Sequence, residues 1–219
     1  MYKLFLPILF VFFAVNIQAQ DFKGTRAVGL IIGVSQSNVE EDAGTNVSEN
    51  STSLRLAPEF TYFVTNRWRI GFNVNFEQSD RTYYPNNPTL ESRYKSTTIG
   101  GAFLSTYHYW FSEKIAFLIE PSLGFNRTQF ESMNQASQQK GITNSFFTNA
   151  SIGVLFVIKK RFGVDLTTAL TQLAYTKTSF DRPNNASGNI NQNEFSFLFL
   201  GGDALSVLSN VSIGVKYFF

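Results

Sequence analysis

The chain has 219 residues, with 24 Phe and 9 Tyr but no cysteine, and its formal net charge is +2. No basic run stands out, so nucleic acid is not an expected partner. The lack of cysteine excludes N-terminal lipidation and a disulfide-stapled domain. High aromatic content with a mean hydropathy near zero is unusual for a soluble enzyme. It is typical of a transmembrane β-barrel, whose apolar outer band alternates with polar interior positions.

Residues 1–19 have the layout of a secretory signal. Lys3 supplies a positive charge, residues 4–15 are almost continuously apolar, and residues 17–19 offer a cleavage site that ends on the small residue Ala19. The apolar run is about a dozen residues, whereas a membrane-spanning helix needs about 20. We therefore expect a cleaved signal peptide over 1–19, with a membrane anchor as the alternative, and a single mature domain over 20–219.

Eight segments of the mature chain alternate apolar residues with small or polar ones. This period of two is the pattern of β-strands that have one apolar face. In the second segment, Pro58 cannot donate to a hydrogen-bond ladder, so we expect a bulge or irregularity there. The segments span about 26–36, 52–64, 68–77, 94–111, 115–126, 144–158, 162–171 and 207–219.

The connections between these segments alternate between short and long. Short turns are expected at 65–67, 112–114 and 159–161, and long polar loops at 37–51, 78–91, 129–143 and 175–205. The last loop contains the apolar residues 195–200, which form either a strand extension above the membrane or part of an extra hairpin. Tight turns on the periplasmic side and longer outer loops are the pattern of outer-membrane barrels.

The last segment, V-L-S-N-V-S-I-G-V-K-Y-F-F, ends the chain on the aromatic Phe219. It resembles the closing strand of bacterial outer-membrane β-barrels, and the mature chain resembles the small OmpA/OmpX-type barrels (the outer membrane protein β-barrel domain). This resemblance implies an all-β, closed, antiparallel, up-and-down transmembrane barrel of about eight strands, located in the outer membrane. It also implies outer-membrane lipid and lipopolysaccharide as partners, and barrel assembly machinery that recognises the strand ending at Phe219. We expect a monomer.

A soluble lipocalin-like barrel would show the same alternation with its apolar face inside, and it is the structural alternative. A membrane barrel of eight strands has an interior that side chains can fill. Its inward positions would combine small residues with charges of both signs, which can pair across the lumen, and a three-residue turn at 65–67 places Arg55 opposite Glu77. The expected inward charges are Arg55, Glu59, Arg69, Glu77, Glu120, Asp165 and Lys216. A filled, charge-paired interior argues against a wide open channel.

No catalytic, cofactor-binding or metal site is expected. The single histidine, His108, lacks the H-x-S arrangement of lipid A deacylase barrels and cannot supply the acidic and histidine pairs of the protease barrels. We expect it to fill the lumen or to lie at the interface. One histidine without cysteine makes a zinc site improbable. Glu40, Glu41 and Asp42 could bind calcium weakly, but a solvated acidic loop is the simpler interpretation.

The leading hypothesis is therefore a non-enzymatic barrel with a structural or surface-interaction role through its extracellular loops. The first alternative is a narrow porin or a conduit for small or hydrophobic solutes. The second alternative is an enzyme that modifies an envelope lipid.

Overall fold

The computed structural model describes residues 21–40, 48–84, 92–134, 137–159, 161–181, 190–199 and 211–219. The expected signal peptide and the acidic residues Glu41 and Asp42 lie outside these ranges. No helix within them is long and apolar enough to span a membrane. The strands are β1 (Arg26–Glu40), β2 (Ser48–Phe63), β3 (Trp68–Tyr84), β4 (Ser92–Trp110), β5 (Ile115–Asn134), β6 (Ser137–Lys159), β7 (Phe162–Phe180), β8 (Ile190–Phe199) and β9 (Val211–Phe218).

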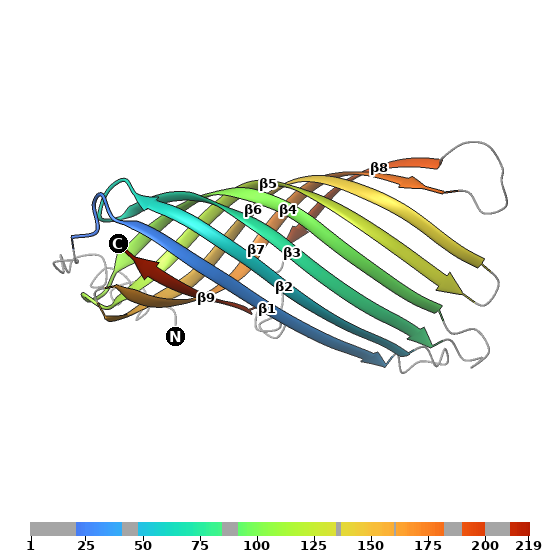
Figure 1. Cartoon of the computed structure of the whole chain (residues 1–219), viewed down its shortest axis with the longest axis horizontal. Helices are drawn as coiled ribbons and strands as arrows, with labels where there is room; N and C mark the ends of the chain where they lie inside the picture. The colour runs from blue at the N-terminus through green and yellow to red at the C-terminus, as the bar shows by residue number, and fades with distance from the viewer. Residues whose placement is uncertain are drawn as a thin grey trace, which may run out of the picture.

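Eight of these strands close into an antiparallel ring (Figure 1). Strands β1 to β7 pair in chain order, β7 pairs with β9, and β9 returns to β1 in a register that runs from Ala27↔Phe218 to Ile32↔Ile213. Closure matters because an open sheet edge in lipid would leave backbone groups without partners, at several kcal/mol each. The predicted closed barrel of about eight strands is confirmed.

Strand β8 is not part of this closed ring. It pairs with the second half of β7, from Thr171↔Phe199 to Phe180↔Ile190, while β9 pairs with the first half of β7. Residues 195–199 are thus part of an extra hairpin, one of the two predictions for this region. Beyond Ile32, β1 pairs only with β2 among the described residues.

The strands are longer than the sequence pattern predicts. Much of the expected loops at 37–51, 78–91, 129–143 and 175–205 continues as paired strand. Outside a membrane both faces of a strand can be polar, so the ladder continues where the apolar alternation stops. That alternation therefore predicted the membrane-crossing part of each strand and not the strand itself.

The short turns at 65–67 and 112–114 are confirmed, and residue 160 of the third turn lies outside the described residues. Both turns use a hydroxyl in the same way. Thr65 Oγ1 accepts hydrogen bonds from the backbone N–H groups of Arg67 and Trp68, at 3.2 and 3.0 Å. In the second turn, Ser112 Oγ accepts from Lys114 and Ile115, at 3.2 and 3.1 Å. These hydroxyls fix the turn backbone and define what we call the turn end of the barrel, opposite the loop end.

Pro58 produces an irregularity but no bulge. It pairs with Leu30 in an unbroken β1–β2 register. The β2–β3 ladder omits Ala57 and Pro58 and resumes in the same register at Glu59↔Asn73. The register shifts occur instead in the β6–β7 pair, between Ala150 and Ser151 and between Val157 and Lys159. The missing donor of proline is therefore accommodated without an extra residue.

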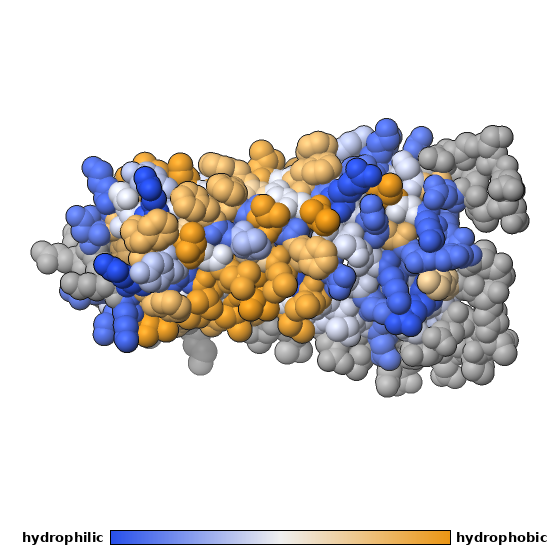
Figure 2. All heavy atoms as spheres, viewed as in Figure 1, coloured by the Kyte–Doolittle hydropathy of each residue, from blue (hydrophilic) through white to orange (hydrophobic). Residues whose placement is uncertain are grey.

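The outer face carries a broad apolar belt, seen in orange toward the turn-end side of Figure 2, and the loop end is polar. Typical belt residues are Leu30, Phe72 and Ile213, which are 41%, 55% and 50% exposed, while charged residues such as Arg69 are buried in the lumen. A soluble protein does not expose an apolar surface of this extent. The lipocalin-like alternative is wrong, and the chain is a transmembrane barrel.

Candidate functional site: a sealed lumen

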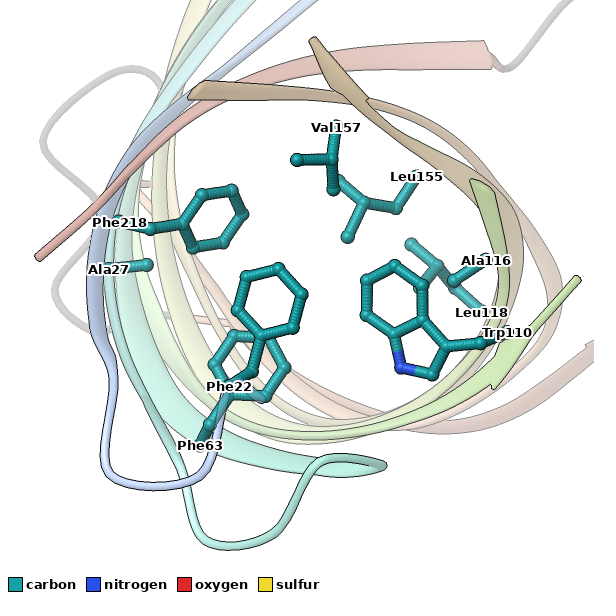
Figure 3. Close-up of a cluster of buried hydrophobic side chains, with 9 residues drawn as sticks. All are labelled: Phe22, Ala27, Phe63, Trp110, Ala116, Leu118, Leu155, Val157 and Phe218. Carbon is teal, nitrogen blue, oxygen red and sulfur yellow. The ribbon is translucent and has the colours of Figure 1, made fainter. Parts of the chain in front are cut away.

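The turn end of the lumen is filled by an apolar cluster that we call the plug (Figure 3). Its members are Phe22, Ala27, Phe63, Trp110, Ala116, Leu118, Leu155, Val157 and Phe218. The ring of Phe22 stacks on those of Phe63 and Trp110, each at a centroid distance of 5.1 Å. Phe218 approaches Phe22 to 5.4 Å. These rings come from the segment before β1 and from β2, β4 and β9, so the plug joins distant parts of the chain.

The turn residue Asn66 holds the segment before β1 in the lumen mouth. Its Oδ1 accepts hydrogen bonds from the backbone N–H groups of Phe22 and Lys23, at 3.1 and 2.8 Å. Its backbone oxygen accepts from Trp110 Nε1 at 2.9 Å. Gly24 has a φ of +83°, a conformation open to glycine at little cost, and its N–H donates to the Phe63 oxygen at 2.9 Å. The reversal at Gly24 directs the Phe22 ring inward.

A second layer, the charge layer, lies directly above the plug. Its members are Glu59, Arg69, Glu120, Asp165 and Lys216. Lys216 Nζ lies 2.5 Å from Glu59 Oε1 and 3.0 Å from Asp165 Oδ2. Arg69 lies 3.8 Å from Glu59 through Nη1 and 3.3 Å from Glu120 through Nη2. The acids and bases therefore alternate across the lumen, and the predicted pairing of inward charges is confirmed for these five residues.

Neighbouring residues leave room for these ion pairs and add hydrogen bonds to them. Thr106 Oγ1 donates to Glu120 Oε2 at 2.6 Å and accepts from Arg69 Nη2 at 3.2 Å. A Cβ atom added at Gly214 would lie 1.9 Å from Asp165 Oδ1. The carboxylate can reach Lys216 because position 214 has no side chain. Buried charges require such pairing and hydrogen bonding to be tolerated.

His108 lies between the plug and the charge layer and is fully buried. Its ring is 5.0 Å from that of Phe63, and its Nδ1 is 3.3 Å from the backbone oxygen of Arg67. The expected lumen-filling role is confirmed by this placement. Among the described residues, no group of three or more His, Cys, Asp or Glu could hold a metal ion.

A cavity of about 480 Å³ lies above the charge layer, on the loop side. Its lining includes Arg55 and Glu77, which occupy paired positions on β2 and β3 as the turn length predicted. Further lining comes from amides and hydroxyls such as those of Asn149, Gln172 and Ser122. From the turn end outward, the lumen is thus an apolar plug, a paired charge layer and a cup with a mixed polar and apolar lining.

Sequence reasoning found the inward charges but missed Phe22. This residue precedes the first amphipathic segment, so no alternation marks it. The available signals were a single aromatic residue soon after the expected cleavage site and a glycine two residues later.

No protein-family profile matches the sequence, and no curated protein does. Solved structures do match. The outer membrane protein OprG from Pseudomonas aeruginosa has a TM-score of 0.52 at 14% identity, with 93% of this chain and 99% of that chain covered. Ail of Yersinia pestis has a TM-score of 0.40 at 13% identity, over 90% of this chain and 99% of its own. Matches at such low sequence identity indicate a similar fold but not a shared function. The chain therefore has the fold of the small outer-membrane β-barrels that its sequence resembles.

Proposed function

We propose that this protein is a non-enzymatic outer-membrane barrel that acts through its loop-end surface and does not conduct solutes along its axis. One observation carries the proposal: side chains of the plug and the charge layer fill the lumen at the turn end. A hydrated ion would have to displace the Phe22 and Trp110 rings and then part the Lys216 pairs. Each of these steps opens a well-packed or charge-compensated contact.

The loop end offers a large polar surface. Strand β5 continues nine residues past the belt residue Phe125, to Asn134, and pairs with β6 throughout this length. At about 3.3 Å per residue, this hairpin extends roughly 30 Å along the strand direction. Two exposed ion pairs lie at this end of the barrel. Lys140–Glu131, at 3.4 Å, is on the hairpin itself, and Arg93–Asp80 joins β4 to β3. A long paired hairpin of this kind can present side chains to partners outside the cell.

The proposed location is the outer membrane, with the turn end in the periplasm. The apolar belt, the barrel fold and the signal-like residues 1–19 support this location. We propose a monomer, exported through the signal peptide and inserted by assembly machinery that recognises the strand ending at Phe219. Lipopolysaccharide and other outer-membrane lipids would surround the belt.

We also propose that the protein does not catalyse a reaction. The single histidine is enclosed by Phe63 and Trp110, where a substrate cannot reach it without disruption of the plug. An alanine at His108 should leave any envelope-lipid activity of the cell unchanged, and an activity lost with this variant would argue for the enzyme alternative.

Conductance in a planar bilayer tests the leading proposal against a porin. We expect the mature chain, shown to be folded by its heat-modifiable mobility, to give no single-channel steps. Regular steps would contradict the sealed lumen. The surface role is tested in a deletion strain. The full chain should restore any envelope defect or partner binding, whereas a folded variant with the β5–β6 hairpin cut back to Phe125 and Phe146 should not.

A further inference from the structure

The outer border of the belt has an ordered arrangement of side chains on β5, β6 and β7. Phe125, Phe146 and Tyr175 occupy paired positions on these strands and are exposed, with the first two rings 4.9 Å apart. They form an aromatic row. Aromatic residues of transmembrane barrels gather where the hydrocarbon meets the lipid headgroups.

A cationic row follows immediately on the loop side. Two residues beyond each ring, Arg127, Asn144 and Lys177 again occupy paired positions and share the outward face. Arg127 and Lys177 are exposed and lie two strand spacings apart, which is about 10 Å. Two positive charges therefore stand on the outward face, two residues beyond the aromatic row on the loop side.

These two cations differ from Arg93 and Lys140 at the loop end because they lack acidic partners. Arg93 pairs with Asp80 at 2.5 Å, and Lys140 pairs with Glu131 at 3.4 Å. Neither Arg127 nor Lys177 has a carboxylate within ion-pair distance among the residues that the structure describes. Their charge is available to an anion from outside the chain.

An apolar hollow leads from the belt to Arg127. A groove of about 430 Å³ on the outer face is lined by Ile99, Gly101, Phe125 and Arg127, together with Thr97, Gly100 and Gln129. Gly101 opens it, since the belt positions on either side along β4, Ile99 and Phe103, carry large side chains. An apolar groove with a guanidinium in its lining suits an amphiphile with a hydrocarbon chain and an anionic headgroup.

We propose that Arg127 and Lys177 bind the phosphates of a phosphorylated saccharolipid of the lipid A class, with one acyl chain in the groove over Gly101. The inference rests on the proposed outer-membrane location, because it places this row in the outer leaflet. Guanidinium matches phosphate oxygens in a bidentate geometry, and the lysine adds a compact charge. The amide of Asn144, between the two cations, can donate a hydrogen bond to the same headgroup.

The test uses the full mature chain in phosphatidylcholine nanodiscs with diphosphoryl lipid A, and with enzymatically dephosphorylated lipid A as the second probe. Bound lipid is counted by native mass spectrometry across a concentration series. The variants are Arg127→Gln, Lys177→Gln and the double variant. Lys114→Gln and Lys159→Gln remove exposed cations at the turn end and serve as matched controls.

We expect affinity for the diphosphoryl lipid to fall about five-fold for each cation removed and about twenty-five-fold for both. The controls should bind as the unaltered chain does, and the dephosphorylated lipid should bind weakly to every variant. Equal binding of both lipids, or a double variant that binds like the unaltered chain, would overturn the lipid site. A chain that does not insert at all would instead overturn the proposed membrane location, so the two failures are distinguishable.

Discussion

Replacement of Lys216 by Met tests whether the charge layer depends on its balance of charges. The ammonium group contacts both Glu59 and Asp165, and its side chain is 2% exposed. The layer contains three carboxylates and two cations. Without Lys216 it keeps one cation for three acids, and Asp165 loses its ion-pair partner within the layer.

The expected cost follows from the burial of these groups. Removal of one partner from a buried ion pair typically destabilises a protein by about 3–5 kcal/mol. With a urea dependence of about 2 kcal/mol per molar, the unfolding midpoint should fall by about 2 M. The assay refolds the mature chain into phospholipid and follows the heat-modifiable band across a urea series. Lys159→Met, which removes an exposed lysine, should change stability by less than about 0.5 kcal/mol.

A triple variant separates charge balance from packing. Glu59→Gln, Asp165→Asn and Lys216→Met together leave Arg69 and Glu120, which already lie 3.3 Å apart. This variant should be more stable than Lys216→Met alone, since neutral groups need no counter-ion. The reasoning would be refuted if Lys216→Met had the same urea midpoint as the control Lys159→Met. It would also be refuted if the triple variant were no more stable than Lys216→Met.

Three further predictions concern the plug, the loop end and the C-terminus. Phe22→Ala should cost about 3 kcal/mol in the same urea assay, because the ring loses its stacking on Trp110; an unchanged midpoint would show that the segment before β1 is not a structural plug. Arg93→Gln should raise the pKa of the Asp80 carboxyl. Both residues lie outside the membrane, and the hydrogen bond from Arg93 holds this pKa below its ordinary value. The pKa of Asp80 is lower in the folded protein than in the unfolded chain, so the ion pair stabilises the protein at pH values above the pKa of the unfolded chain. This contribution, less than about 1 kcal/mol, is lost as the pH falls through the pKa of the folded protein. Carboxyl NMR of Asp80 in the variant measures the change, and a titration identical to that of the unaltered chain would contradict it. Deletion of Phe219 removes the two backbone hydrogen bonds to Arg26 and should impair assembly in cells more than refolding in detergent; normal insertion would end the proposed role of the terminus.

The membrane-crossing part of the barrel could be predicted from the sequence because one physical constraint fixes it. Lipid outside and charge inside impose strict alternation, so residues such as Arg69 and Lys216 could be assigned to the lumen from their spacing alone. Even Arg55 opposite Glu77 followed from the length of one turn. Outside the lipid this constraint disappears, and the polar strand extensions of β3, β5 and β6 could not be distinguished from loops.

The contacts within the lumen could not be predicted for a different reason. Glu59, Asp165 and Lys216 come from β2, β7 and β9, and their meeting depends on the stagger of the closed ring, which no local pattern encodes. Phe22 enters the lumen only because Gly24 reverses the chain and Asn66 captures its backbone. Such long-range contacts depend on the assembled fold.

Side-specific labelling of a cysteine in the cup tests the sealed lumen most directly. The chain has no natural cysteine, so Ser122→Cys, in the cup lining above the charge layer, would be the single thiol. In oriented proteoliposomes, Met133→Cys reports the loop side and Glu113→Cys the turn side for a membrane-impermeant maleimide. The sealed barrel predicts that position 122 reacts only from the side on which position 133 reacts. Reaction from the side of position 113 would show an open path through the plug and would contradict the account.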